Sequence, residues 1–294
     1  MPQTSPRLER VACLDSRGLH RMAYWEWGER DNPRVLVCVH GLSRQGRDFD
    51  TLARALCADY RVVCPDVAGR GESDWLADPA GYVIPAYVAD MVTLLARLGA
   101  EQVDWVGTSM GGLIGLGVAA LPVRSGEPLV RRLVLNDVGP AIEPAAVARI
   151  AAYLGQAPRF ASLDAAADYL HGISLGFGVR ERERWLELTR PMLRPDGEGF
   201  RLHYDPQIAL PIRALTPEIA AAGEAALWHA YGTLRCPTLL LRGAESDLLS
   251  PETARAMTER GPKARLHEFA GVGHAPMLID AEQIAVVKEF LLAP

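Results

Sequence analysis

A serine hydroxyl in a glycine-flanked turn is the first candidate for chemistry. Gly107-Thr108-Ser109-Met110-Gly111 matches G-x-S-x-G, and it lies between an apolar run at 103–107 and a helical pattern at 111–121. A sharp turn from strand to helix lifts the serine hydroxyl above the sheet edge, and it needs small residues two positions before and two after the serine. This context predicts that Ser109 is a nucleophile.

An alcohol is a poor nucleophile near neutral pH and needs a base. His274 is the predicted base, because it lies in a glycine-rich loop (271–276) between a weak strand pattern at 265–269 and a helical pattern at 281–292. A loop at the carboxyl edge of a sheet can reach a nucleophile on the same edge. His40 is the rival, but it ends an apolar run and precedes Gly41, which favours a role in shaping a loop.

The base in turn needs a carboxylate that holds its tautomer. Asp247 is the predicted acid, because it follows the apolar run 238–241 and precedes His274 in the chain. Asp137 stays an alternative, since it ends the preceding apolar run and would lie at the same sheet edge. Glu245 is a weaker alternative in the same loop as Asp247.

Acyl transfer also requires two N–H donors for the oxyanion. The amide of Met110, directly after the nucleophile, is one predicted donor. The other is the amide of Leu42, in the loop 40–44 that follows the apolar run 35–39.

These residues need a sheet that brings loops to one edge. Short apolar runs alternate with longer helical patterns, which predicts an α/β fold with a mainly parallel sheet and helices on both faces. The alternation stops after Asp137, and 139–234 shows helical patterns with no convincing strand. We therefore expect a catalytic core of 1–138 and 235–294 and a helical cap of 139–234. The expected strands lie at 21–28, 35–39, 61–64, 103–107, 133–135, 238–241 and 265–269, and the expected cap helices at 145–154, 164–171, 180–193 and 217–231.

The composition of the chain limits the classes of partner that it is expected to bind. The net charge is −5, which provides no basic field for nucleic acid or for anionic lipid. Five cysteines without a C-x-x-C pair fit neither a disulfide framework nor a zinc site, and Cys38 and Cys64 are predicted to be buried thiols. The sequence has no apolar segment of signal-peptide or membrane-spanning length, so we expect a cytoplasmic protein without membrane insertion. Whether the chain forms a homodimer stays open.

Taken together and in order, these motifs resemble the α/β-hydrolase superfamily over about residues 22–292. The resemblance rests on 40–41, 66–73, 107–112, 243–247 and 273–274. It implies an eight-stranded sheet, a helical cap inserted after the sixth strand, and neither a metal nor an organic cofactor. It also implies that Asp66 and Arg70 form a structural turn and take no part in catalysis.

Within the superfamily, the chain is most similar to serine carboxylesterases and enol-lactonases. Dehalogenases and epoxide hydrolases of this fold use an aspartate nucleophile, where this chain has Ser109. Proline iminopeptidases carry Trp at the position of Met110, and C–C hydrolases usually carry Trp at the position of Ala275. The resemblance implies hydrolysis of carboxylic esters of small molecules through an acyl-enzyme. A C–C bond or lactone hydrolase is the alternative enzyme, and a small-molecule receptor on the hydrolase fold is the alternative without catalysis.

Candidate substrate contacts come from the loop after Leu42 and from the cap. Arg44 could pair with a substrate carboxylate in a fork geometry that Lys cannot copy. The favoured interpretation is that Arg44 and Arg47 are solvated residues paired with Asp48 or Asp50, because exposed arginines are common. Aromatic cap residues could form pocket walls: Phe160, Phe177, Trp185, Tyr204 and Trp228.

Overall fold

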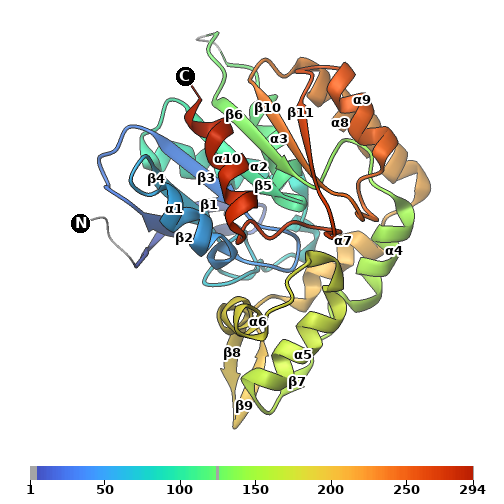
Figure 1. Cartoon of the computed structure of the whole chain (residues 1–294). Helices are drawn as coiled ribbons and strands as arrows, with labels where there is room; N and C mark the ends of the chain where they lie inside the picture. The colour runs from blue at the N-terminus through green and yellow to red at the C-terminus, as the bar shows by residue number, and fades with distance from the viewer. Residues whose placement is uncertain (1–4, 124–125, 294) are drawn as a thin grey trace.

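An eight-stranded, mainly parallel sheet forms the centre of the protein (Figure 1). The computed structural model describes residues 5–123 and 126–293. The strand order is β1-β2-β4-β3-β5-β6-β10-β11, in which β1 pairs with β2 and β2 with β4 in antiparallel fashion and the remaining pairs are parallel. The strands are β1 (Arg7–Asp15), β2 (Gly18–Trp27), β3 (Val35–Val39), β4 (Arg61–Pro65), β5 (Val103–Thr108), β6 (Val130–Asn136), β10 (Thr238–Gly243) and β11 (Arg265–Phe269). The predicted α/β-hydrolase fold class is confirmed.

Helices cover both faces of the sheet because the central strands are apolar on both sides. In β3, Val37 packs into one hydrophobic cluster while its neighbours Leu36 and Cys38 pack into the other. One cluster includes apolar side chains of α2 (Ile84–Leu98), α3 (Met110–Ala119) and α9 (Pro251–Glu259). The other includes those of α1 (Asp50–Leu56) and α10 (Ala281–Leu292).

Strand β1 was not predicted from the sequence. It pairs with β2 at the edge of the sheet, and most of its side chains are partly or fully exposed. The charged residues Arg7, Glu9 and Arg10 dilute the apolar signal that identified the central strands, because an edge strand buries only one face.

The insertion between β6 and β10 is not purely helical, so the prediction that 139–234 contains no strand was wrong. It holds five α-helices and a three-stranded antiparallel sheet in the order β7-β9-β8. These strands are only two to four residues long, and a run so short shows no alternation that sequence could reveal. The elements are α4 (Pro144–Tyr153), β7 (Arg159–Phe160), α5 (Leu163–Ile173), α6 (Arg182–Thr189), β8 (Leu193–Asp196), β9 (Gly199–Leu202), α7 (Ala209–Arg213) and α8 (Pro217–Thr233). The part from α5 to β9 lies at the bottom of Figure 1, and the division at residues 139 and 234 stays a prediction.

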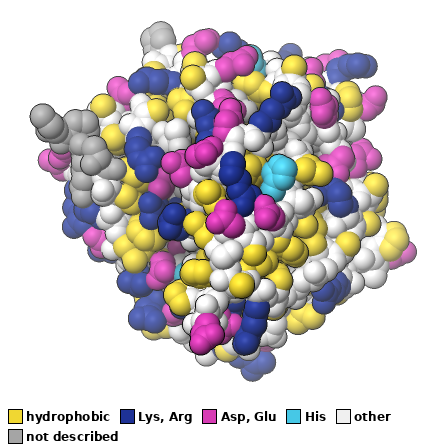
Figure 2. Space-filling view, turned by 60° about the horizontal axis from the view of Figure 1, so that its bottom comes forward, with side chains coloured by type: hydrophobic (Ala, Val, Ile, Leu, Met, Phe, Trp, Pro, Cys, Tyr) yellow, Lys and Arg dark blue, Asp and Glu magenta, His cyan; other side chains and the backbone are white. Residues whose placement is uncertain are grey.

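The surface and the cysteines agree with the composition. Figure 2 shows the bottom of Figure 1 turned forward, where basic and acidic side chains are interspersed rather than gathered in a field of one sign. All five cysteines are free and buried, which confirms the prediction for Cys38 and Cys64. Among residues 5–123 and 126–293, no helix combines the length and the apolar character needed to cross a membrane.

Candidate active site

Ser109 lies in a strained turn between β5 and α3, as the glycine pattern predicts. Its backbone has φ 52° and ψ −118°, which a residue with a side chain rarely adopts. A Cβ on Gly107 would lie 2.3 Å from the Gly111 carbonyl oxygen, and a Cβ on Gly111 would lie 2.0 Å from the Val39 carbonyl oxygen. The spacing of the glycines is therefore the condition for the turn to pack against the neighbouring strand.

His274 connects Ser109 to a buried carboxylate. Its Nε2 lies 3.0 Å from Ser109 Oγ, and its Nδ1 lies 2.7 Å from Asp137 Oδ2. Because the carboxylate can only accept, Nδ1 carries the proton and Nε2 is free to accept one from the serine. The predicted nucleophile and base thus lie within hydrogen-bond distance, and their catalytic roles stay predictions.

The carboxylate beside His274 belongs to Asp137, so the prediction that Asp247 holds this histidine was wrong. Asp137 directly follows β6, and its side chain is fully buried. Asp247 is 47% exposed, and its carboxylate forms an ion pair with Arg149 of α4 at 2.6 Å. Glu245, the third candidate, is exposed.

The loop after β10 does not provide the carboxylate that contacts His274. It provides hydrogen-bond donors to the carboxylate of Asp137. Ser246 Oγ donates to Asp137 Oδ2 at 2.6 Å, and the Gly243 amide donates to Asp137 Oδ1 at 2.9 Å. A turn closed by the Ser246 amide and the Gly243 carbonyl (2.9 Å) aims the serine inward, so the next side chain, Asp247, points outward. Sequence reasoning missed Ser246, whose only signal was its place between two candidate acids.

The two amides predicted to bind an oxyanion are available. In the described part of the chain, neither Leu42 N–H nor Met110 N–H has a hydrogen-bond acceptor. A Cβ on Gly41 would lie 3.7 Å from Ser109 Cβ, so the loop that carries Leu42 passes directly beside the nucleophile. Both amides remain candidate donors for a developing negative charge on the substrate.

Buried polar residues fix this loop. Arg70 is fully buried, and its Nε donates to the Leu42 carbonyl at 2.9 Å. His40 accepts from the Val67 amide at Nε2 and donates from Nδ1 to the Gly41 carbonyl. Burial lowers the pKa of His40 to about 3, so its ring is neutral and shapes the loop. Asp66 accepts from the amide of Gly46, in agreement with the structural role that the resemblance implies.

A small cavity of about 80 Å³ opens onto Ser109 and His274. The loop after β3 forms one wall and the cap forms the other. The lining residues include Leu42, Arg44, Asp48, Arg149, Ile150, Tyr153, Leu170, Ile173, Phe177, Met192, Leu202, Tyr204 and Met277. Such a cavity has room for several water molecules.

Only part of the predicted substrate contacts lines this cavity. Arg44 and Tyr204 do, and the Tyr204 hydroxyl donates to the Gln156 carbonyl at 3.1 Å. Trp185 lies behind the wall, where it stacks on Phe177 with ring centroids 6.0 Å apart. Trp228 packs against Tyr231 in α8 and is not among the described wall residues. The proposal of Trp185 and Trp228 as pocket walls was therefore wrong, because both pack against other side chains outside the described cavity wall.

Comparison with known proteins agrees with this geometry. A sequence model of the alpha/beta hydrolase family matches residues 36–287. The chain is an α/β-hydrolase. It is 57% identical over 97% of its length to a 3-hydroxybutyrate-oligomer hydrolase of Cupriavidus necator, of which it covers 98%.

Two solved structures share the fold of this α/β-hydrolase over nearly its whole length. An alpha/beta hydrolase from Novosphingobium aromaticivorans is 34% identical, with a TM-score of 0.82 and coverage of 97% of this chain and 98% of that one. A putative hydrolase from Rickettsia typhi has a TM-score of 0.85 and 27% identity, with 98% of each chain covered. Because these matches span nearly the whole chain, the insertion between β6 and β10 belongs to the shared architecture.

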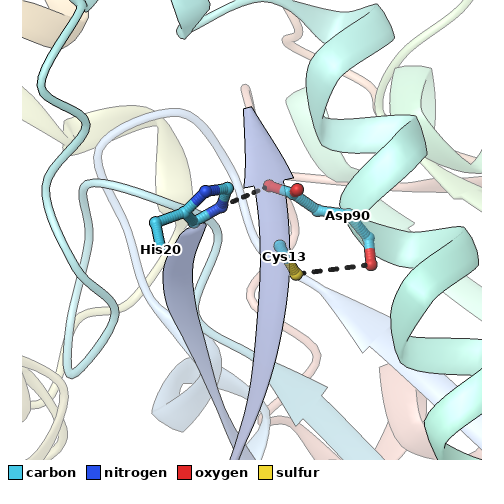
Figure 3. A group of neighbouring side chains, drawn as sticks. All are labelled: Cys13, His20 and Asp90. Atoms are coloured by element: carbon cyan, nitrogen blue, oxygen red, sulfur yellow. Dashed lines mark hydrogen bonds and ion pairs between the residues drawn. The ribbon is translucent and has the colours of Figure 1, made fainter. Parts of the chain in front are cut away.

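A second group of ionisable side chains lies where β1 and β2 of the α/β-hydrolase pack against α2 (Figure 3). Cys13, His20 and Asp90 place candidate metal-ligand atoms within 4.8 Å of one another. Two contacts join these groups: His20 Nε2 lies 3.2 Å from Asp90 Oδ2, and Cys13 Sγ lies 4.0 Å from the Asp90 carbonyl oxygen. We therefore interpret the group as a buried contact between the β1–β2 hairpin and α2.

This contact predicts a pH-dependent contribution to stability. The hydrogen bond to Asp90 raises the pKa of His20 above its ordinary value of 6.5, while burial opposes the rise. Asp15 and Asp74 also favour the charged ring. The thiol that faces this group is that of Cys13. Because the folded-state pKa is the higher one, the stabilisation is full below pH 6.5 and is lost as the pH rises through the folded-state pKa.

We expect His20→Gln to reduce the free energy of unfolding by about 1 kcal/mol more near pH 6 than near pH 9. Urea unfolding of wild type and variant across this range measures the difference. His229→Gln, the same substitution at an exposed position, is the control for the effect of glutamine itself. A His20→Gln effect that grows toward high pH would contradict the interpretation.

Proposed function

We propose that this α/β-hydrolase cleaves short oligomers of 3-hydroxybutyrate, or of closely similar hydroxy acids, through an acyl-enzyme on Ser109. The chain is a hydrolase that acts on carboxylic ester bonds. The observation that carries the proposal is the continuous hydrogen-bond chain from Ser109 through His274 to Asp137 at the wall of a small cavity. The relative from Cupriavidus necator, at 57% identity, supports the choice of substrate.

Acylation follows from the positions of the three side chains. Ser109 Oγ attacks the ester carbonyl carbon while His274 Nε2 takes the hydroxyl proton. The oxyanion that forms is bound by the amides of Leu42 and Met110. His274 then gives its proton to the departing alkoxy oxygen, so the C–O bond breaks and the alcohol leaves.

Deacylation repeats the same steps with water. His274 takes a proton from a water molecule, the resulting hydroxide attacks the acyl carbon, and Ser109 recovers its proton as the carboxylic acid leaves. Throughout, Asp137 stabilises the imidazolium that forms on His274, and the donors from Ser246 and Gly243 hold the carboxylate in place. The net reaction adds one water to one ester bond and needs no cofactor.

We also propose a cytoplasmic location. Five free, buried cysteines support it, because reducing compartments keep thiols unpaired. Fractionation of cells with an antibody against this chain tests the location directly, and recovery with the secreted fraction would contradict it.

The substrate proposal predicts monomer release from the 3-hydroxybutyrate dimer and trimer with a kcat/KM of at least about 10⁴ M⁻¹ s⁻¹. Chromatography of the products measures it, with a p-nitrophenyl ester, an enol-lactone and 2-hydroxymuconate semialdehyde as comparison substrates. Fast turnover of the aryl ester without turnover of either oligomer would reject hydroxy acid oligomers as substrates. A few turnovers followed by a stall on every substrate would point to a receptor.

A further inference from the structure

Arg44 is a buried arginine in the wall of the active-site cavity. Only 7% of its surface is exposed, although the sequence favoured a solvated residue. A Cβ on Gly41 would lie 3.7 Å from Ser109 Cβ and 3.9 Å from Arg44 Cγ. The aliphatic part of the Arg44 side chain therefore begins close to Ser109, with Gly41 between them.

The guanidinium keeps one edge unused. Arg44 donates from Nε to Asp48 Oδ2 at 2.6 Å and from Nη2 to Asp48 Oδ1 at 2.7 Å. Within the described residues, Nη1 donates to no acceptor. Nη1 and the second hydrogen of Nη2 form the planar pair of donors that a carboxylate accepts. Asp48 thus holds the arginine in one orientation and leaves its free edge for a ligand.

Asp48 is itself buried beside Arg44. Burial raises the pKa of the Asp48 carboxyl, and the neighbouring Arg44 partly opposes this rise. Arg44 therefore favours the charged form of Asp48, and the two side chains form one buried pair.

One short turn of the cap covers both Arg44 and the histidine loop. In η3 (Leu175–Phe177), the Phe177 ring centroid lies 5.8 Å from Arg44 Cζ. The neighbouring Gly176 accepts a hydrogen bond from the Gly273 amide at 2.6 Å, directly before His274. Arg44 and His274 therefore lie under the same lid. Because His274 protonates the departing oxygen, this is the side on which the leaving group lies.

We propose that Arg44 binds the free carboxylate of the departing hydroxy acid, so that the enzyme cuts the ester bond next to the carboxyl end of its substrate. The inference rests on the proposed ester hydrolysis. In a 3-hydroxy acid ester only two carbons separate the ester oxygen from the carboxyl carbon, so the group that binds the carboxylate must lie in the same cavity as the nucleophile, as Arg44 does. Each turnover would then release one hydroxy acid.

The test compares the 3-hydroxybutyrate dimer as a free acid with its methyl ester, which has the same bond to cleave and no carboxylate. We expect wild type to favour the free acid in kcat/KM by at least about tenfold. Arg44→Gln alone leaves a buried Asp48 unpaired, so the main variant is the double substitution Arg44→Gln with Asp48→Asn, which removes both charges. It should reduce the preference for the acid about 10- to 100-fold, chiefly through KM.

Two control variants distinguish the loss of carboxylate binding by Arg44 from a general loss of structure or activity. Arg47 makes the same two-pronged contact with Asp50 but does not line the described cavity wall, so Arg47→Gln should keep the wild-type preference. Arg44→Lys keeps the charge without the planar fork and should fall between wild type and the double variant. Thermal melts establish that each variant is folded before its preference is measured.

A trimer labelled in its carboxyl-terminal unit tests which bond is cut. The label should appear first in monomer. First appearance of the label in dimer would overturn the inference. So would a wild-type ratio of kcat/KM for free acid over methyl ester near one. An unchanged ratio in the folded double variant, or loss of the preference in Arg47→Gln, would also overturn it. If wild type hydrolyses neither the free-acid dimer nor its methyl ester nor the aryl ester, the proposed function itself falls.

Discussion

Replacing Ser109 with alanine is expected to lower ester hydrolysis by at least about 10⁴-fold while the protein stays folded. The substitution removes the atom that attacks the substrate and leaves the strained turn without new side-chain contacts. Turnover of a short-chain aryl ester and a thermal melt measure the two parts of this prediction.

Ser162→Ala is the matched control for that experiment. Ser162 caps α5 through a hydrogen bond to the Ala165 amide and does not belong to the described cavity wall. Its loss should cost about 1 kcal/mol of stability and leave turnover close to wild type. A Ser109→Ala protein with activity within tenfold of wild type would remove Ser109 from the mechanism.

The second large effect separates two aspartates. Asp137→Asn should lower kcat about 10⁴-fold, because an amide in this position no longer stabilises the imidazolium or fixes the tautomer of His274. Asp247→Asn should stay within tenfold of wild type, because its carboxylate pairs with Arg149 at a partly exposed site and does not contact His274. Steady-state kinetics of both variants on one substrate decides the matter, and the reverse ranking would restore Asp247 as the acid.

The nucleophile and the base could be predicted because their signals are local. The turn at Ser109 requires glycine at Gly107 and Gly111 for steric reasons, and the requirement is visible in the sequence itself. His274 likewise stands in a glycine-rich loop between recognisable elements. Sequence periodicity also identified the central strands, since strands buried on both faces are continuously apolar.

The acid could not be chosen in this way. Asp137 and Asp247 both follow strands that end at the same edge of the sheet, but only the side chain of Asp137 points toward His274. That direction is set by the turn from Gly243 to Ser246, whose hydrogen bonds form only once β6 and β10 are paired. The sequence kept Asp137 as an alternative but contained no local signal that would rank it first.

The burial of Arg44 likewise could not be predicted from the sequence. Its pairing with Asp48 was one of the two partners expected from the spacing, and it is present. Its burial was not expected, because it depends on η3 of the cap, more than a hundred residues later in the chain. Contacts between the cap and the core decide which charged residues face the substrate, and no short-range pattern encodes them.

The most direct test of the central claim is to label the protein with an alkyl fluorophosphonate and locate the adduct by mass spectrometry of peptides. An acyl-enzyme mechanism predicts one phosphonate per chain, attached to Ser109, with activity lost in proportion to labelling. It also predicts that labelling is much slower in Asp137→Asn than in Asp247→Asn. Inactivation with the phosphonate on another residue, or full labelling of Ser109 with esterase activity retained, would contradict the account.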